Sequence, residues 1–144
     1  MEIRILGAAD LGLLEAVAEG VFDDAVNPSL SAEFLSDPRH HLCVAIDAGR
    51  IVGFASAVHP DKPTQLWINE VGVADSHLKR GIGKAILERM IALAGELGCT
   101  EAWTLTNEDN APARALYRSA GGEEMTGVVM MTFRAGKRAA SAAC

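Results

Sequence analysis

The stretch Arg80-Gly81-Ile82-Gly83-Lys84 lies between two segments of different periodicity. The run before it, residues 66–73 (LWINEVGV), is apolar with one acid and has the length of a strand. The run after it, residues 82–97, carries apolar residues three or four apart, as one helix face requires. The first turn of a helix leaves N–H groups unpaired and favours an anion. We therefore predict that this turn holds the pyrophosphate of a cofactor, with Lys79, Arg80 and Lys84 adding positive charge.

The rest of the chain predicts strands and helices on both sides of this turn. Strands are expected at 2–6, 41–46, 51–59, 66–73, 101–106 and 128–133, and helices after Asp10, from Ser29 or Ser31 to Leu35, from Gly81 to Leu97, and after Asn110. This order implies an α/β sheet with antiparallel hairpins first and a βαβ crossover later. We predict one domain over residues 1–134 and a frayed tail over 135–144.

Composition narrows the class of protein. The chain has 144 residues, is 49% hydrophobic and has a net charge of −6, which suits one domain and disfavours a nucleic-acid partner. Cys43, Cys99 and Cys144 form no close pair, so we expect free thiols, the first two buried, in a reducing compartment. Early charges at Glu2 and Arg4 and the absence of a run of ~20 apolar residues predict a cytoplasmic protein without a membrane partner. The scattered histidines predict no metal site.

Two nucleotide-binding motifs fail on individual residues of the turn. A dinucleotide fingerprint G-x-G-x-x-G needs a third glycine where this chain has Ile86. A Walker loop needs serine or threonine after Gly83-Lys84, and Ala85 stands there. The turn therefore belongs to another kind of phosphate site.

Two motifs in order carry a resemblance to a known family. Val71-Gly72-Val73 ends the fourth strand before the Gly81-x-Gly83 turn, and Asn110-Ala111-Pro112-Ala113-Arg114-Ala115-Leu116-Tyr117 follows later, with Gly121-Gly122 after it. In this combination the chain, from Ile3 to Phe133, resembles the GNAT superfamily of acyl-CoA N-acyltransferases. The resemblance implies a mixed, mostly antiparallel sheet of six or seven strands, splayed between strands 4 and 5 and flanked by about four helices.

The resemblance also implies acetyl-CoA as the acetyl donor. The turn residues Lys79, Arg80, Gly81, Ile82, Gly83 and Lys84 would hold the pyrophosphate. Val71 and Val73 would pair with the pantetheine arm like an added strand, and Gly72 would ease a bulge that splays the sheet. Asn110 and Ala113 would contact the arm from the other side. The motif position that is usually Gln or Arg is Leu78 here, so the backbone amides and neighbouring cations would carry more of the pyrophosphate.

Acetyl transfer to an amine needs a neutral nucleophile and a protonated leaving group. An alkylammonium has a pKa of about 10.4, so a base must help near neutral pH. Glu70 is the candidate, acting through a water; it alternates with Ile68 and Gly72, and burial in so apolar a run would raise its pKa. Tyr117, the only tyrosine, stands where the family places its general acid. The alternative for Glu70 is a polar residue on a half-exposed strand face. The alternative for Tyr117 is an aromatic side chain packed into the core.

The acceptor is the least constrained part of the sequence. Asp23, Asp24 and Glu33 lie between the first two predicted helices, where the family builds its acceptor site, and could hold a polycation or be solvated charge. The layout is similar to small aminoglycoside N-acetyltransferases of the 3-N type, so the expected acceptor is an aminoglycoside or other small polyamine. The alternatives are a protein N-terminus or lysine, or a non-catalytic acetyl-CoA sensor. Family analogy suggests a homodimer.

Overall fold

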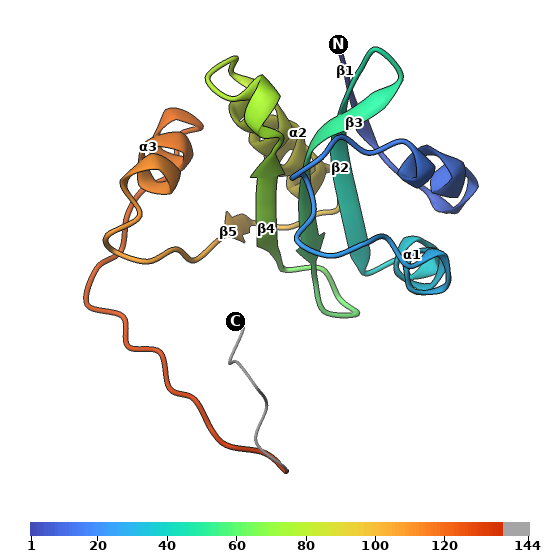
Figure 1. Ribbon diagram of the computed structural model, residues 1–144. Helices are drawn as coiled ribbons and strands as arrows, with labels where there is room; N and C mark the ends of the chain where they lie inside the picture. Colours follow the sequence, from blue (N-terminus) through green and yellow to red (C-terminus); the bar gives the residue numbers. More distant parts are fainter. Residues whose placement is uncertain (137–144) are drawn as a thin grey trace.

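The computed structural model describes residues 1–136, and its centre is one mixed sheet (Figure 1). The strands are β1 (Glu2–Ile5), β2 (His40–Asp47), β3 (Arg50–Val58), β4 (Gln65–Val73) and β5 (Glu101–Trp103), in that spatial order. The first three pairings are antiparallel and β4–β5 is parallel. The α-helices are α1 (Pro28–Ser36), α2 (Ile82–Glu96) and α3 (Ala111–Ser119), and the 3-10 helices are η1 (Ala8–Glu15) and η2 (Asp75–His77).

Helices cover both faces of the sheet, and each face has its own apolar core. Helix α2 packs on one face, and the buried side chains there include Cys43, Ala55, Leu66, Ile68, Ile82, Ile86 and Met90. The helices η1 and α1 cover the other face, where Leu14, Leu35, Val44, Ile51 and Phe54 are buried. Burying each large apolar side chain stabilises the fold by about 1.5–3 kcal/mol. Within residues 1–136, no helix is long and apolar enough to cross a bilayer.

The sheet opens between β4 and β5. Their pairing covers only three residues of each strand, from Gln65↔Glu101 to Trp67↔Trp103. Just beyond it, the Thr104 hydroxyl donates to the Ile68 carbonyl at 2.9 Å. The remainder of β4 then continues paired with β3 alone. This splay between the fourth and fifth strands is the arrangement that the family resemblance implies.

A β-bulge in β4 changes which side chains share a face. Ser56 pairs with Glu70 and Ala57 pairs with Ile68, so Asn69 is the extra residue. Ile68 therefore packs in the α2 core, whereas Gly72 packs against Phe54 in the opposite core. The expectation that Ile68, Glu70 and Gly72 alternate on one face is wrong. The expected bulge exists, but Asn69 makes it rather than Gly72.

Several other expectations about elements need correction. Residues 128–133 are not a strand, so the sheet has five strands within residues 1–136 rather than six or seven. The first predicted helix is a 3-10 helix that ends at Glu15, and β5 ends at Trp103 rather than at Thr106. Cys43 is buried, which raises the pKa of its thiol to about 12, but Cys99 is only half-buried. Most of the predicted tail, 137–144, lies outside the described residues.

Candidate acetyl-CoA site and acceptor face

The glycine turn has the backbone of an anion site. Gly81 is the N-cap of α2 with φ +77°, and a Cβ built there would meet no atom within 4 Å. Lys79 is also in the left-handed region, with φ 60°. Among the described residues no side chain caps the helix, so the first amides of α2 are open to a ligand. The side chains of Lys79, Arg80 and Lys84 are exposed around the turn.

Two details of the turn were not expected from the motif. Lys84 lies 3.7 Å from Glu88 one helical turn on, an exposed pair that offsets part of its charge. Gly83 is buried, and a Cβ there would lie 3.2 Å from the Leu116 side chain. Gly83 therefore lets α3 approach α2, and its side of the helix faces α3 rather than open space. The two glycines of the turn have different functions.

We expect Gly83→Val to destabilise the protein by about 1–3 kcal/mol, because the added methyl groups overpack the contact with Leu116. Gly95→Val is the matched control in the same helix, since a Cβ at Gly95 meets nothing within 4 Å. Urea denaturation measures both variants. Equal midpoints for the two variants would contradict a packing function for Gly83.

A polar chain ties the loop before the turn to the β2–β3 hairpin. The Ser76 hydroxyl lies 2.7 Å from His77 Nδ1, and His77 Nε2 lies 3.0 Å from Asp47 Oδ2. The hydrogen bond from His77 lowers the pKa of Asp47, and the positive charge of Arg80 acts in the same direction. These contacts position η2, from which the chain runs into Lys79 and Gly81. His77 is one of the scattered histidines of the sequence, and only the fold brings Asp47 beside it.

The pKa of Asp47 predicts a pH dependence of stability. A carboxylate whose folded pKa is below its unfolded value, about 3.9, contributes stability above that value and loses it as pH falls through the folded pKa. We therefore expect Asp47→Asn to lower the urea midpoint modestly at pH 7, and we expect this difference from the wild type to shrink as pH falls below about 4. A difference that stays constant from pH 7 to pH 2 would contradict this linkage.

The open edge of β4 leads from the splay toward the turn. Val71 and Val73 pair with Ala55 and Gly53 of β3, and β5 does not reach them on the other side. A Cβ at Gly72 would lie 2.7 Å from the Phe54 ring and 2.9 Å from the Val21 carbonyl oxygen. Only glycine therefore fits beneath the chain that crosses this face. The free edge of residues 71–73 is the part of the sheet to which an extended ligand can add.

Glu70 lies on β4 beside this edge, on the face covered by η1 and α1. It pairs across the sheet with Ser56 and follows the bulged Asn69. Glu70 is exposed, so the burial expected for it is not present. Its exposed carboxylate leaves room for a water between it and an amine at the mouth of the opening. Glu70 therefore stays a candidate base because it is exposed beside the opening, and not because it is buried.

Helix α3 carries the remaining motif residues across the opening from β4 (Figure 1). The Asn110 side-chain oxygen accepts a hydrogen bond from the Ala113 amide at 3.2 Å and caps the helix. Those two groups are therefore engaged with each other, and the Asn110 amide nitrogen is the part left to face a ligand. Tyr117 is half-buried and packs on the α2 side of the core. Glu70 and Tyr117 come from opposite walls of the opening.

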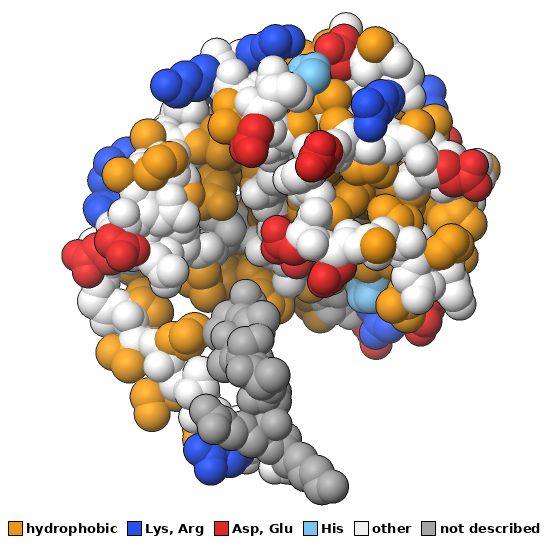
Figure 2. All heavy atoms as spheres, viewed as in Figure 1, with side chains coloured by type: hydrophobic (Ala, Val, Ile, Leu, Met, Phe, Trp, Pro, Cys, Tyr) orange, Lys and Arg blue, Asp and Glu red, His pale blue; other side chains and the backbone are white. Residues whose placement is uncertain are grey.

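The acidic residues in the first third of the chain lie at different distances from β4. The Phe22 ring lies 4.5 Å from the Phe54 ring, and the Val21 carbonyl oxygen approaches Gly72, so the loop crosses the sheet next to β4. Asp23 and Asp24 follow directly and are exposed on the face that carries Glu70. Glu33 lies on α1, which packs against β2, farther across the sheet. In Figure 2, acidic side chains gather in the middle of this face and basic ones on its rim.

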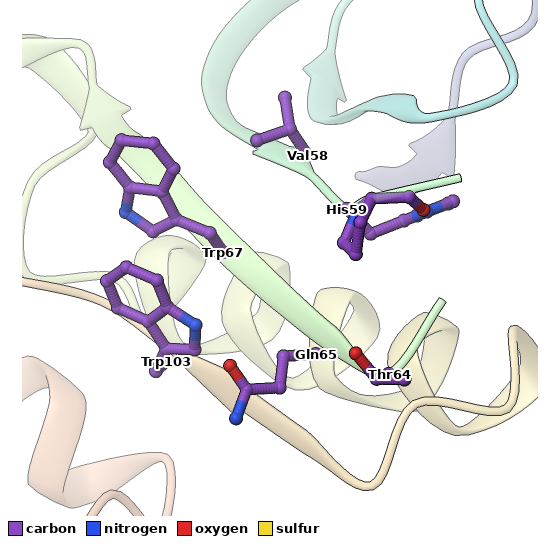
Figure 3. A pocket seen from close by; sticks show the side chains of 7 residues that line it. Val58, His59, Thr64, Gln65, Trp67 and Trp103 are labelled. Atoms are coloured by element: carbon purple, nitrogen blue, oxygen red, sulfur yellow. The ribbon is translucent and has the colours of Figure 1, made fainter. Parts of the chain in front are cut away.

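A cavity of about 350 Å³ lies at the start of the splay, next to the β4–β5 pairing (Figure 3). Trp67 and Trp103 form one wall, with ring centroids 5.3 Å apart and an angle of 6° between the planes. His59 lies across from them, and His41 stacks on His59 at 5.0 Å. Burial and the neighbouring histidines lower the pKa of His41 to about 4. The two tryptophans therefore line a cavity while stacking on each other.

Comparisons with known proteins agree with this geometry. A model described as the acetyltransferase (GNAT) family matches residues 13–121. An uncharacterized N-acetyltransferase of Mycobacterium tuberculosis is 28% identical over 90 residues, which are 62% of this chain and 57% of that protein. The streptothricin acetyltransferase of Streptomyces lavendulae is 31% identical over 86 residues, 60% of this chain and 45% of that protein. The chain spans about half the length of these relatives.

The solved structures that it resembles share the fold at low sequence identity. One is AAC(6')-Iy in complex with the bisubstrate analogue CoA-S-monomethyl-acetylneamine. It superimposes with a TM-score of 0.74 at 21% identity and covers 93% of this chain and 98% of its own. At 21% sequence identity, this structural similarity establishes the fold alone.

Proposed function

Because the chain belongs to the GNAT acetyltransferase family, we propose that it transfers an acetyl group from acetyl-CoA to a primary amine in a ternary complex. The observation that carries the proposal is the continuity between two open backbone features. The free edge of β4 at residues 71–73 leads to the uncapped start of α2 at Gly81. An extended thiol arm suits the first feature, and a pyrophosphate suits the second.

The donor contacts follow from this continuity. Backbone amides from Arg80 to Lys84 would hold the pyrophosphate, helped by the positive charges on the rim of the turn. Leu78 is 52% exposed and offers no polar group, so the amides carry more of the anion than a side chain does. Val71 and Val73 would pair with the pantetheine arm, and Asn110 would approach it from the α3 wall.

The chemistry needs one base and one acid on opposite walls. The neutral amine would attack the thioester carbonyl carbon, and its proton would pass through a water to the Glu70 carboxylate. The C–S bond would then break, and the departing sulfur would take a proton from the Tyr117 hydroxyl. Glu70 lies on β4 and Tyr117 lies on α3, the two elements on either side of the opening, which supports these roles.

For the acceptor, we propose a small polyamine of the aminoglycoside kind. Asp23 and Asp24 reach the face of Glu70, because Phe22 packs on Phe54 and draws the loop over the sheet. Several carboxylates beside one base attract a polycation and favour its approach. The streptothricin acetyltransferase among the relatives and the neamine analogue bound to a similar fold are consistent with this class. Glu33 would contribute only to a long acceptor, given its place on α1.

A second candidate is a peptide amine, and the cavity by Trp67 and Trp103 is the observation that favours it. Its walls carry no acidic side chain, and stacked indoles suit an apolar side chain more than a polycation. A non-catalytic acetyl-CoA sensor is a third reading, which the two candidate catalytic groups oppose.

A thiol-release assay separates these candidates. The protein with acetyl-CoA is tested against aminoglycosides, linear polyamines and short peptides with free N-termini. We expect turnover with the first two classes and a KM that rises in Asp23→Asn/Asp24→Asn. Turnover with peptides alone would overturn the polyamine acceptor, and CoA binding without any turnover would indicate the sensor.

A further inference from the structure

A side-chain contact marks the point where the opening between β4 and β5 begins. Regular pairing of the two strands ends at Trp67↔Trp103. One residue later, the Thr104 hydroxyl donates to the Ile68 carbonyl oxygen at 2.9 Å, in a half-buried position. The chain after Thr104 leaves β4 and runs toward α3 (Figure 1). The Thr104 hydroxyl therefore ties the two chains together at the start of the opening.

The Ile68 carbonyl belongs to the first peptide of the β4 bulge. A peptide group is planar, so a fixed Ile68 carbonyl also fixes the direction of the Asn69 N–H. Asn69 is the extra residue of the bulge, after which Glu70 pairs with Ser56. The hydrogen bond from Thr104 therefore acts on the backbone that leads directly into Glu70.

The bulge decides which face of the sheet Glu70 occupies. If β4 had no extra residue, Glu70 would pair with Ala55, which is buried in the core beneath α2. With the bulge, Glu70 pairs with Ser56, whose side chain lies on the opposite face from Ala55. A shift of one residue in register turns the side chains of a strand to its other face. The bulge therefore keeps the Glu70 carboxylate on the face of η1 and α1.

We propose that Thr104 is a positioning residue for acetyl transfer, because its hydroxyl fixes the Ile68–Asn69 peptide and thereby holds the bulge that presents the Glu70 carboxylate to the acceptor. The proposal rests on the proposed function, since Thr104 acts through Glu70 as the base. Thr104 itself needs no contact with the acceptor or with acetyl-CoA. Without its hydroxyl, the Ile68–Asn69 peptide can rotate and displace the carboxylate, and small displacements of a catalytic group slow the reaction strongly.

A second threonine, at the other end of the β4–β5 pairing, provides a matched control. The Thr100 hydroxyl donates to the Thr64 carbonyl oxygen at 3.3 Å, in an exposed position. The Thr100 amide donates to the same oxygen at 3.0 Å, so the backbone keeps this tie when the hydroxyl is removed. Thr100→Val therefore makes the same chemical change as Thr104→Val but leaves the carbonyl at its own site paired.

The test is a double-mutant cycle between Thr104 and Glu70. We expect Thr104→Val to lower kcat about 10-fold at pH 7 and to leave the Kd of CoA unchanged, because the turn at the start of α2 is untouched. Thr104→Ser, which keeps the hydroxyl, should recover most of this loss, and Thr100→Val should keep the wild-type kcat. Because Thr104 acts through the carboxylate, adding Thr104→Val to Glu70→Gln should lower kcat no further.

A measurement without turnover tests the same tie. In heteronuclear NMR spectra, we expect the amide resonances of Asn69 and Glu70 to shift in Thr104→Val and to stay in place in Thr100→Val. Resonances that do not move in Thr104→Val would overturn the proposal. So would a wild-type kcat in that variant, or losses that multiply in the double variant. A protein that acetylates no amine would instead refute the proposed function, and the resonances would then decide whether Thr104 holds the bulge.

Discussion

Glu70→Gln is expected to lower kcat by about 100-fold near neutral pH, the low end of what a general base contributes. We expect this low value because Glu70 is exposed beside the open edge of β4, where solvent water can partly replace it as the base. Glutamine keeps the shape and a hydrogen-bond acceptor but takes up no proton at these pH values. The loss should shrink toward high pH, where more of the acceptor amine is already neutral.

Two measurements separate this effect from a binding defect. Steady-state rates from pH 6 to pH 10 follow the expected recovery, and calorimetry with acetyl-CoA should give an unchanged Kd. Glu15→Gln, at an exposed acid on η1 away from the opening, is the matched control and should keep full activity. Wild-type turnover of Glu70→Gln at pH 7 would remove Glu70 from the mechanism.

Gly81→Asp is expected to weaken acetyl-CoA binding by about 100-fold, or about 2.7 kcal/mol. The added carboxylate lies at the uncapped start of α2, where it occupies the anion site and repels the pyrophosphate. The space around Gly81 is open, so the side chain itself meets no clash within the protein. Calorimetry with CoA measures the change directly.

Gly81→Asn is the control that isolates charge. Asparagine and aspartate tolerate the left-handed backbone at φ +77° similarly and have nearly the same size. Asparagine should therefore cost much less affinity for CoA than aspartate. The difference in affinity between the two variants should narrow as the salt concentration rises. Equal losses in the two variants would assign the effect to backbone strain, and unchanged affinity in both would place the pyrophosphate elsewhere.

The donor side was predictable because its signals are local. The apolar period of α2, the glycine at its start and the proline and asparagine that open α3 each act within a few residues of themselves. Local rules of helix capping and periodicity therefore sufficed to locate these helices. The family resemblance then supplied the cofactor that such a turn would hold.

The acceptor side depends on contacts between distant segments. The bulge at Asn69 moves Ile68 and Gly72 to opposite faces, and alternation alone could not reveal it. Residues 128–133 have the composition of a strand, yet a strand needs a partner edge, and no pattern in the sequence states whether one is within reach. The same reason explains why the pairing of His77 with Asp47 was missed.

The turn at Gly81-Ile82-Gly83 shows most clearly which features the sequence determines and which features the tertiary structure decides. The sequence by itself determined that a helix begins here with uncapped first amides, since helix capping is a property of the local chain. Only the tertiary structure decided that Gly81 faces open space while Gly83 admits Leu116 of α3. Two glycines that are identical in the motif differ because one Cα faces open space and the other faces a helix, and only the packing of α3 against α2 distinguishes them.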